Sequence, residues 1–277
     1  METSRKILVL GSGGSLGSYI MANPDNTNDV LIGYNHKTLD VTNRADVVKT
    51  IASEMPNVVI NASAYTQVDA AERDRETAFA VNTLGPQYMA EACNMLSIPL
   101  VHVSTDYVFG DNNPDGYTED CESYNPLNIY GETKLLGELA IKDATDNYYI
   151  VRTSWLFGKN SKNFLAKVIA LAKKTGEVYI VDDEVGCPTY VKDLSKTIYE
   201  ILDNKMAPGI YHCCSSNSLS RFDFAKEALE LMDIHVNMYK TSRFKRDAKV
   251  PFVSILKNTK LHMHRTSIEM IVDYLFH

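Results

Sequence analysis

Residues 7–17 read Ile7-Leu8-Val9-Leu10-Gly11-Ser12-Gly13-Gly14-Ser15-Leu16-Gly17, an apolar run followed at once by a glycine-rich turn. The apolar run is typical of a buried strand, and the glycines at 11, 14 and 17 have the spacing Gly-x-x-Gly-x-x-Gly. Glycines at this spacing let backbone N–H groups and a helix N-terminus approach a pyrophosphate without obstruction by Cβ atoms. We therefore expect a strand, a turn and a helix that bind a dinucleotide through Gly11, Gly13, Gly14, Ser15, Leu16 and Gly17.

The same turn offers a competing interpretation. Residues 13–17 match the Gly-x-Ser-x-Gly pattern in which a serine hydrolase places its nucleophile, here Ser15. That nucleophile normally follows several strands, whereas this turn follows the first strand of the chain. The position of the turn and the glycine spacing therefore favour a dinucleotide-binding protein over a hydrolase.

Further short apolar runs follow at residues 30–32, 58–60, 100–103, 149–151 and 178–181. Between them, as at 44–54 and 70–95, apolar residues recur at intervals of three and four, which is typical of helices. Alternating strands and helices predict an α/β fold, a doubly wound parallel Rossmann sheet with helices on both faces. Pro86 lies inside the second helical stretch, so we expect a break or a fresh start there.

The alternation of strands and helices loosens after about residue 155, where helix candidates remain at 163–174, 191–202 and 220–232. We expect residues 1–155 to form an NAD(P)-binding domain. Residues 156–277 should form mainly a smaller C-terminal substrate lobe, with some segments returning to the first domain. Residues 110–128 are rich in Asp, Asn, Pro, Gly and Tyr without periodicity, and they predict a long loop over the site.

Composition excludes several classes of protein. Apolar residues make up 45% and charged residues 23%, the values of an ordinary globular chain. The net charge of −7 and the lack of a dense Lys/Arg block argue against nucleic acid or a membrane as the partner. Five cysteines form no Cys-x-x-Cys pair, which predicts reduced thiols and a cytoplasmic location. The apolar run near the N-terminus is too short for a signal peptide or a membrane span.

No metal site is expected. The histidines, including those of the segment His262-Met263-His264, have no Cys or carboxylate companions at the spacing of metal ligands.

The residues after the second apolar run bear on the choice of cofactor. They read Gly33-Tyr34-Asn35-His36-Lys37, with no acidic residue before Asp40. Proteins that bind NAD usually place a carboxylate here, which accepts hydrogen bonds from the ribose 2′-OH. The basic residues instead favour a 2′-phosphate, so we expect NADPH, with NADH as the alternative cofactor.

Two motifs point to the chemistry. The fourth apolar run leads into Ser104-Thr105-Asp106-Tyr107, at the edge of the sheet where ligands bind, so the Ser104 and Thr105 hydroxyls can polarise a carbonyl. Downstream, Tyr130 and Lys134 are four residues apart and share one face of a helix. An ammonium there should lower the pKa of the phenol and make it a proton donor. Together the motifs predict hydride transfer to a carbonyl.

These motifs lie in segments that resemble the dTDP-4-dehydrorhamnose reductase family of the extended short-chain dehydrogenases/reductases. The resembling segments, which span most of the chain, are residues 56–72, 104–109, 130–138, 152–155, 183–189 and 209–212. The resemblance implies NAD(P)H-dependent reduction of the C4 ketone of a nucleotide-linked 6-deoxy-4-ketosugar. The first choice is dTDP-4-dehydro-L-rhamnose, reduced to dTDP-L-rhamnose for polysaccharide precursor synthesis. The expected partner is this nucleotide sugar, and a homodimer stays open.

The resemblance also implies roles for individual residues. The catalytic triad would be Thr105, Tyr130 and Lys134. Beside the glycine turn, the cofactor would contact Asn35, His36, Asp40, Val41, Ala62, Ser63, Ala64, Tyr65, Tyr130 and Lys134. The substrate would contact Ser104, Thr105, Asp106, Tyr107 and Trp155.

Two positions depart from the pattern of that family. Ser15 stands where the family commonly has Gln, and Val250-Pro251 stands where it often has Arg-Pro. In place of that arginine, the candidates to meet the substrate's diphosphate are Arg243, Lys245, Arg246 and Lys249.

Two other functions stay open. The regulatory β subunit of methionine adenosyltransferase is similar and keeps the same helix motif without catalysis, whereas Trp155 as a stacking surface for a sugar or base favours the reductase. A sugar-nucleotide epimerase or dehydratase of the same superfamily would retain its cofactor through the cycle. Net consumption of NADPH separates the reductase from both.

Overall fold

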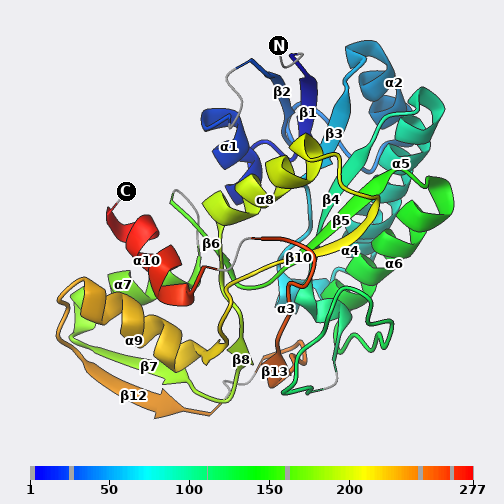
Figure 1. The fold of residues 1–277 in the computed structure, drawn as a ribbon. Helices are drawn as coiled ribbons and strands as arrows, with labels where there is room; N and C mark the ends of the chain where they lie inside the picture. Colours follow the sequence, from blue (N-terminus) through cyan, green and yellow to red (C-terminus); the bar gives the residue numbers. More distant parts are fainter. Residues whose placement is uncertain are drawn as a thin grey trace.

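The computed structural model describes residues 4–24, 28–110, 112–159, 163–242, 246–262 and 265–276. Its centre is a six-stranded sheet in the order β10-β5-β4-β3-β1-β2, in which every neighbouring pair is parallel (Figure 1). The strands are β1 (Lys6–Leu10), β2 (Val30–Tyr34), β3 (Val58–Asn61), β4 (Leu100–Thr105), β5 (Tyr148–Thr153) and β10 (Gly209–Cys213). Parallel strands need crossover connections, and helices supply them here.

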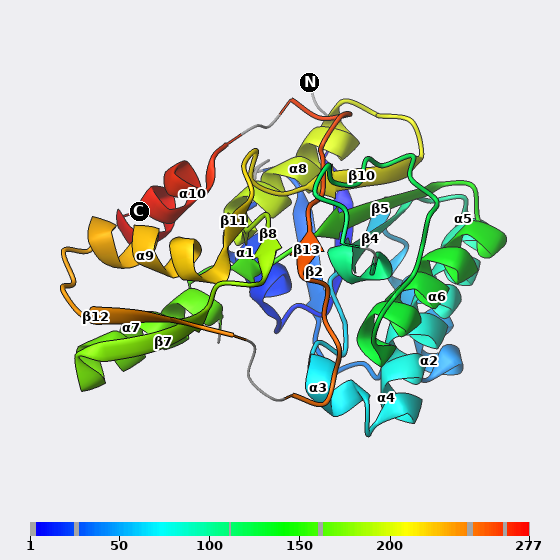
Figure 2. The same ribbon diagram turned by 90° about the horizontal axis from the view of Figure 1, so that it is seen from below.

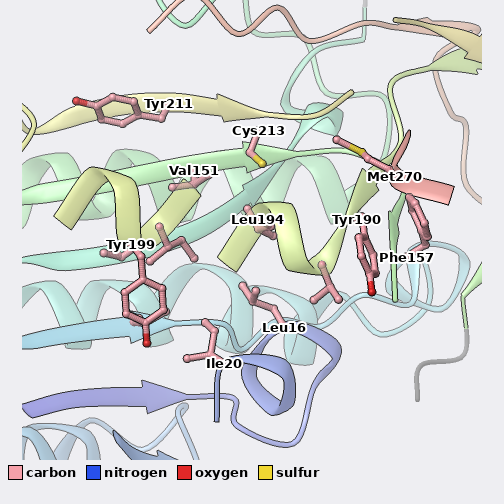
Figure 3. Close-up of a cluster of buried hydrophobic side chains, with 14 of the residues drawn as sticks. Leu16, Ile20, Val151, Phe157, Tyr190, Leu194, Tyr199, Tyr211, Cys213 and Met270 are labelled. Atoms are coloured by element: carbon pink, nitrogen blue, oxygen red, sulfur yellow. The ribbon is translucent and has the colours of Figure 1, made fainter. Parts of the chain in front are cut away.

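Helices cover both faces of this sheet, so the prediction of a doubly wound Rossmann fold is confirmed. On one face lie α2 (Arg44–Glu54), α5 (Gly85–Leu96) and α6 (Ile129–Ala144), packed side by side. On the other lie α1 (Ser15–Ala22) and α8 (Val191–Asp203), which contact each other. Figure 3 shows the apolar core on this second face, where Leu16 and Ile20 of α1 lie near Leu194 of α8.

Burial separates the strand that joins the main sheet from the one that does not. The run at 178–181 forms β7 (Glu177–Val181), which pairs only with β12 (Asn237–Thr241) in the smaller lobe. The sixth strand of the main sheet is instead β10, so the expectation that the run at 178–181 belongs to that sheet is wrong. Buried and exposed residues alternate in β7, whereas the last four residues of β10 are all buried. A strand that is buried on both faces suits a position between two layers of helices.

The helical stretch at 70–95 is divided into four pieces: α3 (Val68–Ala71), α4 (Arg75–Phe79), a π-helical turn η1 (Ala80–Leu84) and α5. Pro86 lies in the first turn of α5, where its missing N–H costs no hydrogen bond. The irregularity is the π turn directly before it. That turn aims Asn82 at the backbone of Tyr65, from whose N–H the Asn82 Oδ1 accepts a hydrogen bond of 2.8 Å.

The smaller lobe is built mostly from residues after 155 and packs beside the carboxyl ends of the main strands (Figure 2). Its helices are α7 (Phe164–Thr175) and α9 (Arg221–Leu231), which cover β7 and β12 around a core of their own. A three-stranded sheet joins β8 (Val185–Gly186), β11 (Leu219–Ser220) and β13 (Val253–Ser254), and β6 (Leu156–Phe157) pairs with β9 (Thr189–Tyr190). The lobe therefore lies at the edge of the main sheet where ligands of α/β folds bind.

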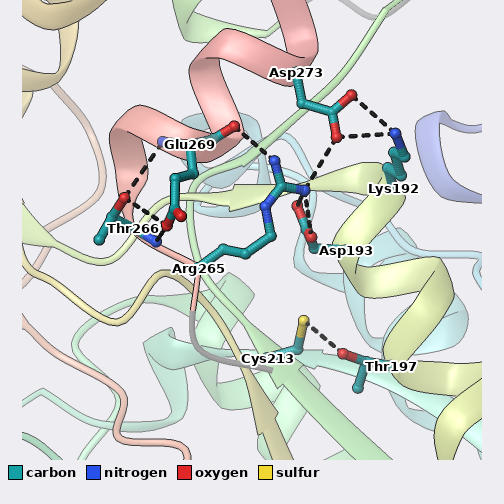
Figure 4. A network of polar contacts seen from close by, with 8 residues as sticks. All are labelled: Lys192, Asp193, Thr197, Cys213, Arg265, Thr266, Glu269 and Asp273. Atoms are coloured by element: carbon teal, nitrogen blue, oxygen red, sulfur yellow. Dashed lines mark hydrogen bonds and ion pairs between the residues drawn. The ribbon is translucent and has the colours of Figure 1, made fainter. Parts of the chain in front are cut away.

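Ion pairs fix the last helix, α10 (Ser267–Phe276), to the rest of the protein (Figure 4). Arg265 donates to Asp193 of α8 at 2.8 Å and to Asp273 of α10 at 3.1 Å. Lys192 of α8 reaches the same Asp273 at 2.9 Å. The C-terminal helix is thus tied to a helix that covers the main sheet.

The loop at 110–128 follows the short helix η2 (Asp106–Val108) and has no helix or strand among its described residues. Tyr117 and Tyr124 stack on Phe109, and Tyr117 forms a bridge with Leu256. None of its described residues lines either pocket of the site below, so the expected cover over the site is not formed by this loop. In the described part of the chain, no helix has the length and apolar character that crossing a membrane requires.

Candidate active site

The glycine turn opens a pocket at the carboxyl end of β1. Gly11 has φ of +85°, and a Cβ there would lie 2.5 Å from the Ser63 backbone nitrogen, so only glycine fits. At Gly17 a Cβ would lie 2.3 Å from the Gly11 carbonyl oxygen. Because glycine has no Cβ, α1 can pack closely on the turn. No side chain caps the N-terminus of α1, and its first turn has no acidic residue. Its N–H groups therefore suit a phosphate.

Most of the expected cofactor residues meet in this first pocket, a cavity of about 390 Å³. They are Gly11, Gly13, Gly14, Asn35, His36, Asp40, Val41, Ala62, Ser63, Ala64 and Tyr65. Ser15 and Leu16 line the second pocket instead, and Gly17 lines neither. The Asp40 carboxylate accepts hydrogen bonds from the Thr42 N–H and hydroxyl, so it is engaged in its own turn.

The second pocket, of about 500 Å³, shares Gly14, Ala62, Ser63 and Ala64 with the first. All the residues expected to be catalytic or to contact the substrate line it: Ser104, Thr105, Asp106, Tyr107, Tyr130, Lys134 and Trp155. Segments distant in sequence, from β4, α6 and the end of β5, thus converge beside the first pocket. Sequence reasoning missed Thr66, Val68, Val103, Thr153, Ser154, Leu156, Asn163 and Arg221, which also line it.

Two orphaned hydroxyls show that this pocket suits a polar ligand. Ser104 Oγ and Thr153 Oγ1 are buried, and among the residues that the structure describes they have no hydrogen-bond partner; both residues line the pocket. Thr153 lies on β5 directly opposite Thr105 of β4. Buried hydroxyls normally find a partner, so a ligand that brings its own donors and acceptors fits here. The sequence signal for Thr153 was available, because it ends a parallel strand as Thr105 does.

The pKa of Tyr130 differs from the expectation that Lys134 lowers it. Burial raises the pKa of Tyr130 to about 12, and a hydrogen bond with Thr105 offsets part of this rise. The Lys134 amine is directed elsewhere, to the Val103 carbonyl at 2.6 Å and to His102 Nε2 at 3.1 Å. Thr105, rather than Lys134, is therefore the group that offsets part of the rise in the pKa of Tyr130.

Asp106 is held on both oxygens. It accepts a hydrogen bond from the Thr105 hydroxyl at 3.0 Å and another from the Ser254 hydroxyl at 2.6 Å. Burial raises its pKa to about 6, although both hydrogen bonds act in the opposite direction. The carboxyl group of Asp106 thereby links the end of β4 to β13 of the smaller lobe.

This raised pKa predicts a pH dependence of stability. The unfolded carboxyl has a pKa of about 4, so between about pH 4 and 6 the folded state holds more protons than the unfolded state. The protonated Asp106 carboxyl therefore contributes its full share to the free energy of unfolding below about pH 4, and this contribution is lost as the pH rises through 6. Relative to Asp106→Asn, the free energy of unfolding of the native protein should fall by roughly 2–3 kcal/mol from pH 4 to 7. Urea titrations at each pH measure this, and parallel curves for the two proteins would contradict it.

Trp155 lies at the wall between the sheet and the smaller lobe. Its backbone is left-handed, with φ of +46°, and a Cβ on Gly186 would lie 2.8 Å from its indole ring. The Arg221 guanidinium lies 3.6 Å from the centre of that ring. One face of the indole is therefore taken by a cation, so a substrate meets the Trp155–Arg221 pair rather than a bare ring.

Arg152, from the same motif, points away from the pocket. Its side chain is fully buried and donates to Glu138 of α6 at 2.6 and 3.0 Å. It also lies 5.1 Å from the centres of the Phe109 and Tyr124 rings. The residue joins β5 to the helix that carries Tyr130 and Lys134, which is a supporting task.

The basic residues expected near the diphosphate are placed differently. Arg246 is bound to Asp69 through two hydrogen bonds of 3.0 and 3.1 Å, and neither it nor Lys249 lines the second pocket. Arg243 and Lys245 lie outside the described residues, as do Met263 and His264. Within the residues that the structure does describe, no cluster of His, Cys, Asp and Glu could hold a metal ion.

Comparison with known proteins gives consistent matches. Residues 5–270 match the profile of the family described as RmlD substrate binding domain. A dTDP-4-dehydrorhamnose reductase of Mycolicibacterium smegmatis is 35% identical over 93% of this chain and 79% of its own. One from Aggregatibacter actinomycetemcomitans is 35% identical, with 92% of each chain covered. A crystal structure of dTDP-4-dehydrorhamnose reductase from Bacillus anthracis in complex with NADP superposes with a TM-score of 0.94, at 33% identity, covering 98% of this chain and 99% of that one.

Proposed function

The chain belongs to the RmlD substrate binding domain family, and on this premise we propose that it reduces the C4 ketone of dTDP-4-dehydro-L-rhamnose to give dTDP-L-rhamnose, with NADPH as the reductant. Relatives named dTDP-4-dehydrorhamnose reductase cover most of both chains. The observation that carries the proposal is the convergence of Thr105, Tyr130 and Lys134 on one pocket beside the glycine turn. The product would serve as a polysaccharide precursor.

The residues of the pocket divide the work. NADPH, when bound, supplies the hydride to C4 of the sugar. Negative charge then develops on the C4 oxygen, and Tyr130 donates its phenolic proton to that oxygen. Tyr130 is fully protonated at neutral pH because burial raises its pKa to about 12. The Thr105 hydroxyl stabilises the negative charge on the same oxygen through a hydrogen bond. Lys134 lines the pocket where the ribose of the cofactor would lie.

The phosphate of NADPH has a suitable environment. His36 and Asn35 line the first pocket at the end of β2, and Asp40 is engaged by Thr42 rather than free to accept from a ribose hydroxyl. The related Bacillus anthracis reductase was solved in complex with NADP. We expect NADPH to be oxidised faster than NADH at equal concentration, and NADH remains the alternative cofactor.

Arg221 is our candidate for the substrate's diphosphate. Arg221 and Lys134 are the cationic side chains that line the second pocket within the described part of the chain, and Arg221 lies over Trp155 at the side of the smaller lobe. Its ion pair with Glu184 is loose, at 3.5 Å. A guanidinium can form two charge-assisted hydrogen bonds to phosphate oxygens, which makes it suited to a diphosphate.

Replacing Arg221 should therefore weaken substrate binding more than turnover. Arg221→Gln is expected to raise KM for the nucleotide sugar roughly 10- to 100-fold, the loss of about 1.5–3 kcal/mol from a charge-assisted hydrogen bond, with kcat changed little. The matched control is Lys226→Gln on the same helix, where the lysine is exposed and paired only loosely with Glu230 at 3.7 Å. Steady-state kinetics at fixed ionic strength measure both. An unchanged KM, or a loss in kcat alone, would argue against this role.

A direct assay tests the function. The protein is mixed with NADPH and enzymatically prepared dTDP-4-keto-6-deoxyglucose together with its 3,5-epimerase, NADPH oxidation is followed, and the product is identified by NMR. Stoichiometric NADPH consumption and an axial or equatorial C4 hydroxyl in the product support the reductase. Conversion beyond that of the 3,5-epimerase alone, without NADPH consumption, would identify an epimerase. No conversion, together with a stoichiometric protein partner, would identify a regulatory subunit like that of methionine adenosyltransferase.

We propose a cytoplasmic location, which the thiols and the substrate support. All five cysteines are free, and four of them are buried, which agrees with a reducing cytoplasm. A homodimer remains a prediction, which light scattering of the purified chain would test.

A further inference from the structure

A buried histidine contacts the catalytic lysine and has no part in the proposed reaction. His102 lies on β4 with no exposed surface, and its Nε2 is 3.1 Å from Lys134 Nζ. Its Nδ1 is 3.0 Å from Asn61 Nδ2, and Asn61 is its direct partner on β3. The Asn61 oxygen accepts from the Ser63 N–H at 3.0 Å and from the Ser63 hydroxyl at 2.6 Å. Ser63, Asn61, His102 and Lys134 thus form one chain of contacts.

The Ser63 N–H determines which atoms donate and which accept in this series of hydrogen bonds. A backbone N–H can only donate, so the side-chain oxygen of Asn61 must face Ser63 and its NH₂ group must face His102. The amide N–H then donates to His102 Nδ1, which must therefore carry no proton. The reverse orientation would place the Asn61 NH₂ against the Ser63 N–H.

The proton of His102 is consequently on Nε2. Burial holds the pKa of His102 well below its usual value, so the ring is neutral and carries a single proton. With Nδ1 occupied as an acceptor, that proton must lie on Nε2. The Nε2–H points at the Lys134 nitrogen.

A neutral amine can accept this hydrogen bond with its lone pair, whereas an ammonium has no lone pair and would place N–H against N–H. Lys134 also donates to the Val103 carbonyl at 2.6 Å, which both forms can do. We propose that His102 is a positioning residue that favours the uncharged amine of Lys134 in the nucleotide-free protein. The proposal extends to proton uptake by Lys134 when the anionic dinucleotide binds, a part that rests on the proposed function.

Besides His102, the ionisable groups near Lys134 are Glu138, Tyr130 and Asp106, and each has other partners or is neutral. Glu138, one turn further along α6, raises the pKa of Lys134, but this carboxylate is already bound by Arg152 of β5. On the pocket side, Tyr130 is a neutral phenol and Asp106 is bonded to Thr105 and Ser254. Burial dominates and lowers the pKa of Lys134 to about 8. The proton that His102 directs at the amine acts in the same direction.

The test is a titration of Lys134 in the nucleotide-free protein. The chain is labelled with ¹³C at the lysine Cε positions, and the Lys134 resonance is identified by its absence in Lys134→Met. We expect its chemical shift to titrate at or below about pH 8. A midpoint near 10.5, the ordinary value for lysine, would overturn the proposal whatever the reductase assay shows.

Two substitutions should reverse the direction of the hydrogen bond between residue 102 and Lys134, by different means. In His102→Gln, an amide oxygen can face Lys134 and accept from its ammonium. In Asn61→Asp, a carboxylate oxygen can accept from Nδ1–H, which moves the ring proton to Nδ1 and leaves Nε2 as an acceptor for the ammonium. Each should raise the midpoint of Lys134 by at least about one pH unit, because a hydrogen bond to the charged form now favours it. His212→Gln, at a buried histidine of β10 bonded to the Lys257 carbonyl, is the control and should leave the midpoint in place.

Near-UV circular dichroism establishes that each variant is folded, and either variant alone suffices if the other is not. A midpoint that stays unchanged in a folded His102→Gln or Asn61→Asp protein refutes the role of His102. Calorimetry of NADP⁺ binding at pH 8 in two buffers of different ionisation enthalpy then counts the protons taken up. Uptake in the native protein and its decrease in His102→Gln support the coupling, and equal heats in both buffers for the native protein refute it.

Discussion

Tyr130→Phe is expected to lower turnover about 10²- to 10⁴-fold while the protein still folds and binds NADPH, because the substitution removes only the proton that the C4 oxygen receives. The ring itself is retained, so its edge contact with Tyr107, at 6.0 Å between centroids, should persist. The hydrogen bond with Thr105 is lost with the hydroxyl. Steady-state kinetics with NADPH and the ketosugar measure turnover, and fluorescence titration measures cofactor affinity.

The matched control is Tyr88→Phe. Tyr88 packs against the core on the α5 face of the sheet and lines neither pocket, so removal of its hydroxyl should leave turnover within about twofold. If Tyr130→Phe turned over at the native rate, the phenol could not be the proton donor. If it lost cofactor binding as well, the effect would reflect damage to the site rather than loss of the proton.

Arg152→Met is expected to destabilise the folded protein by about 3–5 kcal/mol, because it leaves the buried Glu138 carboxylate without its partner. Methionine fills much of the same volume, so the loss reflects the charge rather than a cavity. Tyr124 loses its hydrogen bond from the guanidinium at the same time, which adds a smaller cost. Urea denaturation at pH 7 measures the change in the free energy of unfolding.

The double variant Glu138→Gln/Arg152→Met separates the two contributions. Since it removes the anion together with the cation, it should recover a large part of the stability that Arg152→Met loses. A loss of less than about 1 kcal/mol in the single variant would show that the pair is not held against a low-dielectric interior. A double variant as unstable as the single one would place the effect in packing around Phe109 and Tyr124.

Local sequence signals predicted the elements near the dinucleotide well. The helix at 44–54 begins and ends where its apolar spacing predicted. Gly11 and Gly14 lie at the turn after the first strand, and Gly17 lies in the first turn of α1. These signals depend on residues that are neighbours in sequence, such as Asn43, whose side chain accepts from the N–H groups that begin α2. The site residues near them could be predicted for the same reason.

Signals that depend on distant partners were less reliable. The alternating run of β7 looked like a sheet strand, and it is one, but in the smaller lobe rather than in the main sheet. Arg152 and Trp155 belong to one short segment of the sequence, but the fold sends Arg152 to Glu138, whereas Trp155 lines the second pocket. The long loop at 110–128 was expected over the site, and its tyrosines pack on Phe109 instead.

The amino-acid order alone therefore determined that this chain forms a glycine-turn Rossmann sheet and that it carries a phenol and an amine on one face of a helix, because periodicity and spacing act over a few residues. Only the tertiary structure decided the protonation of that face. The ammonium of Lys134 was expected to act on Tyr130, but the fold turns the amine toward His102 and Val103 and buries the phenol beside Thr105. A pKa depends on burial and on groups within a few ångströms, and these come from strands that only folding brings together.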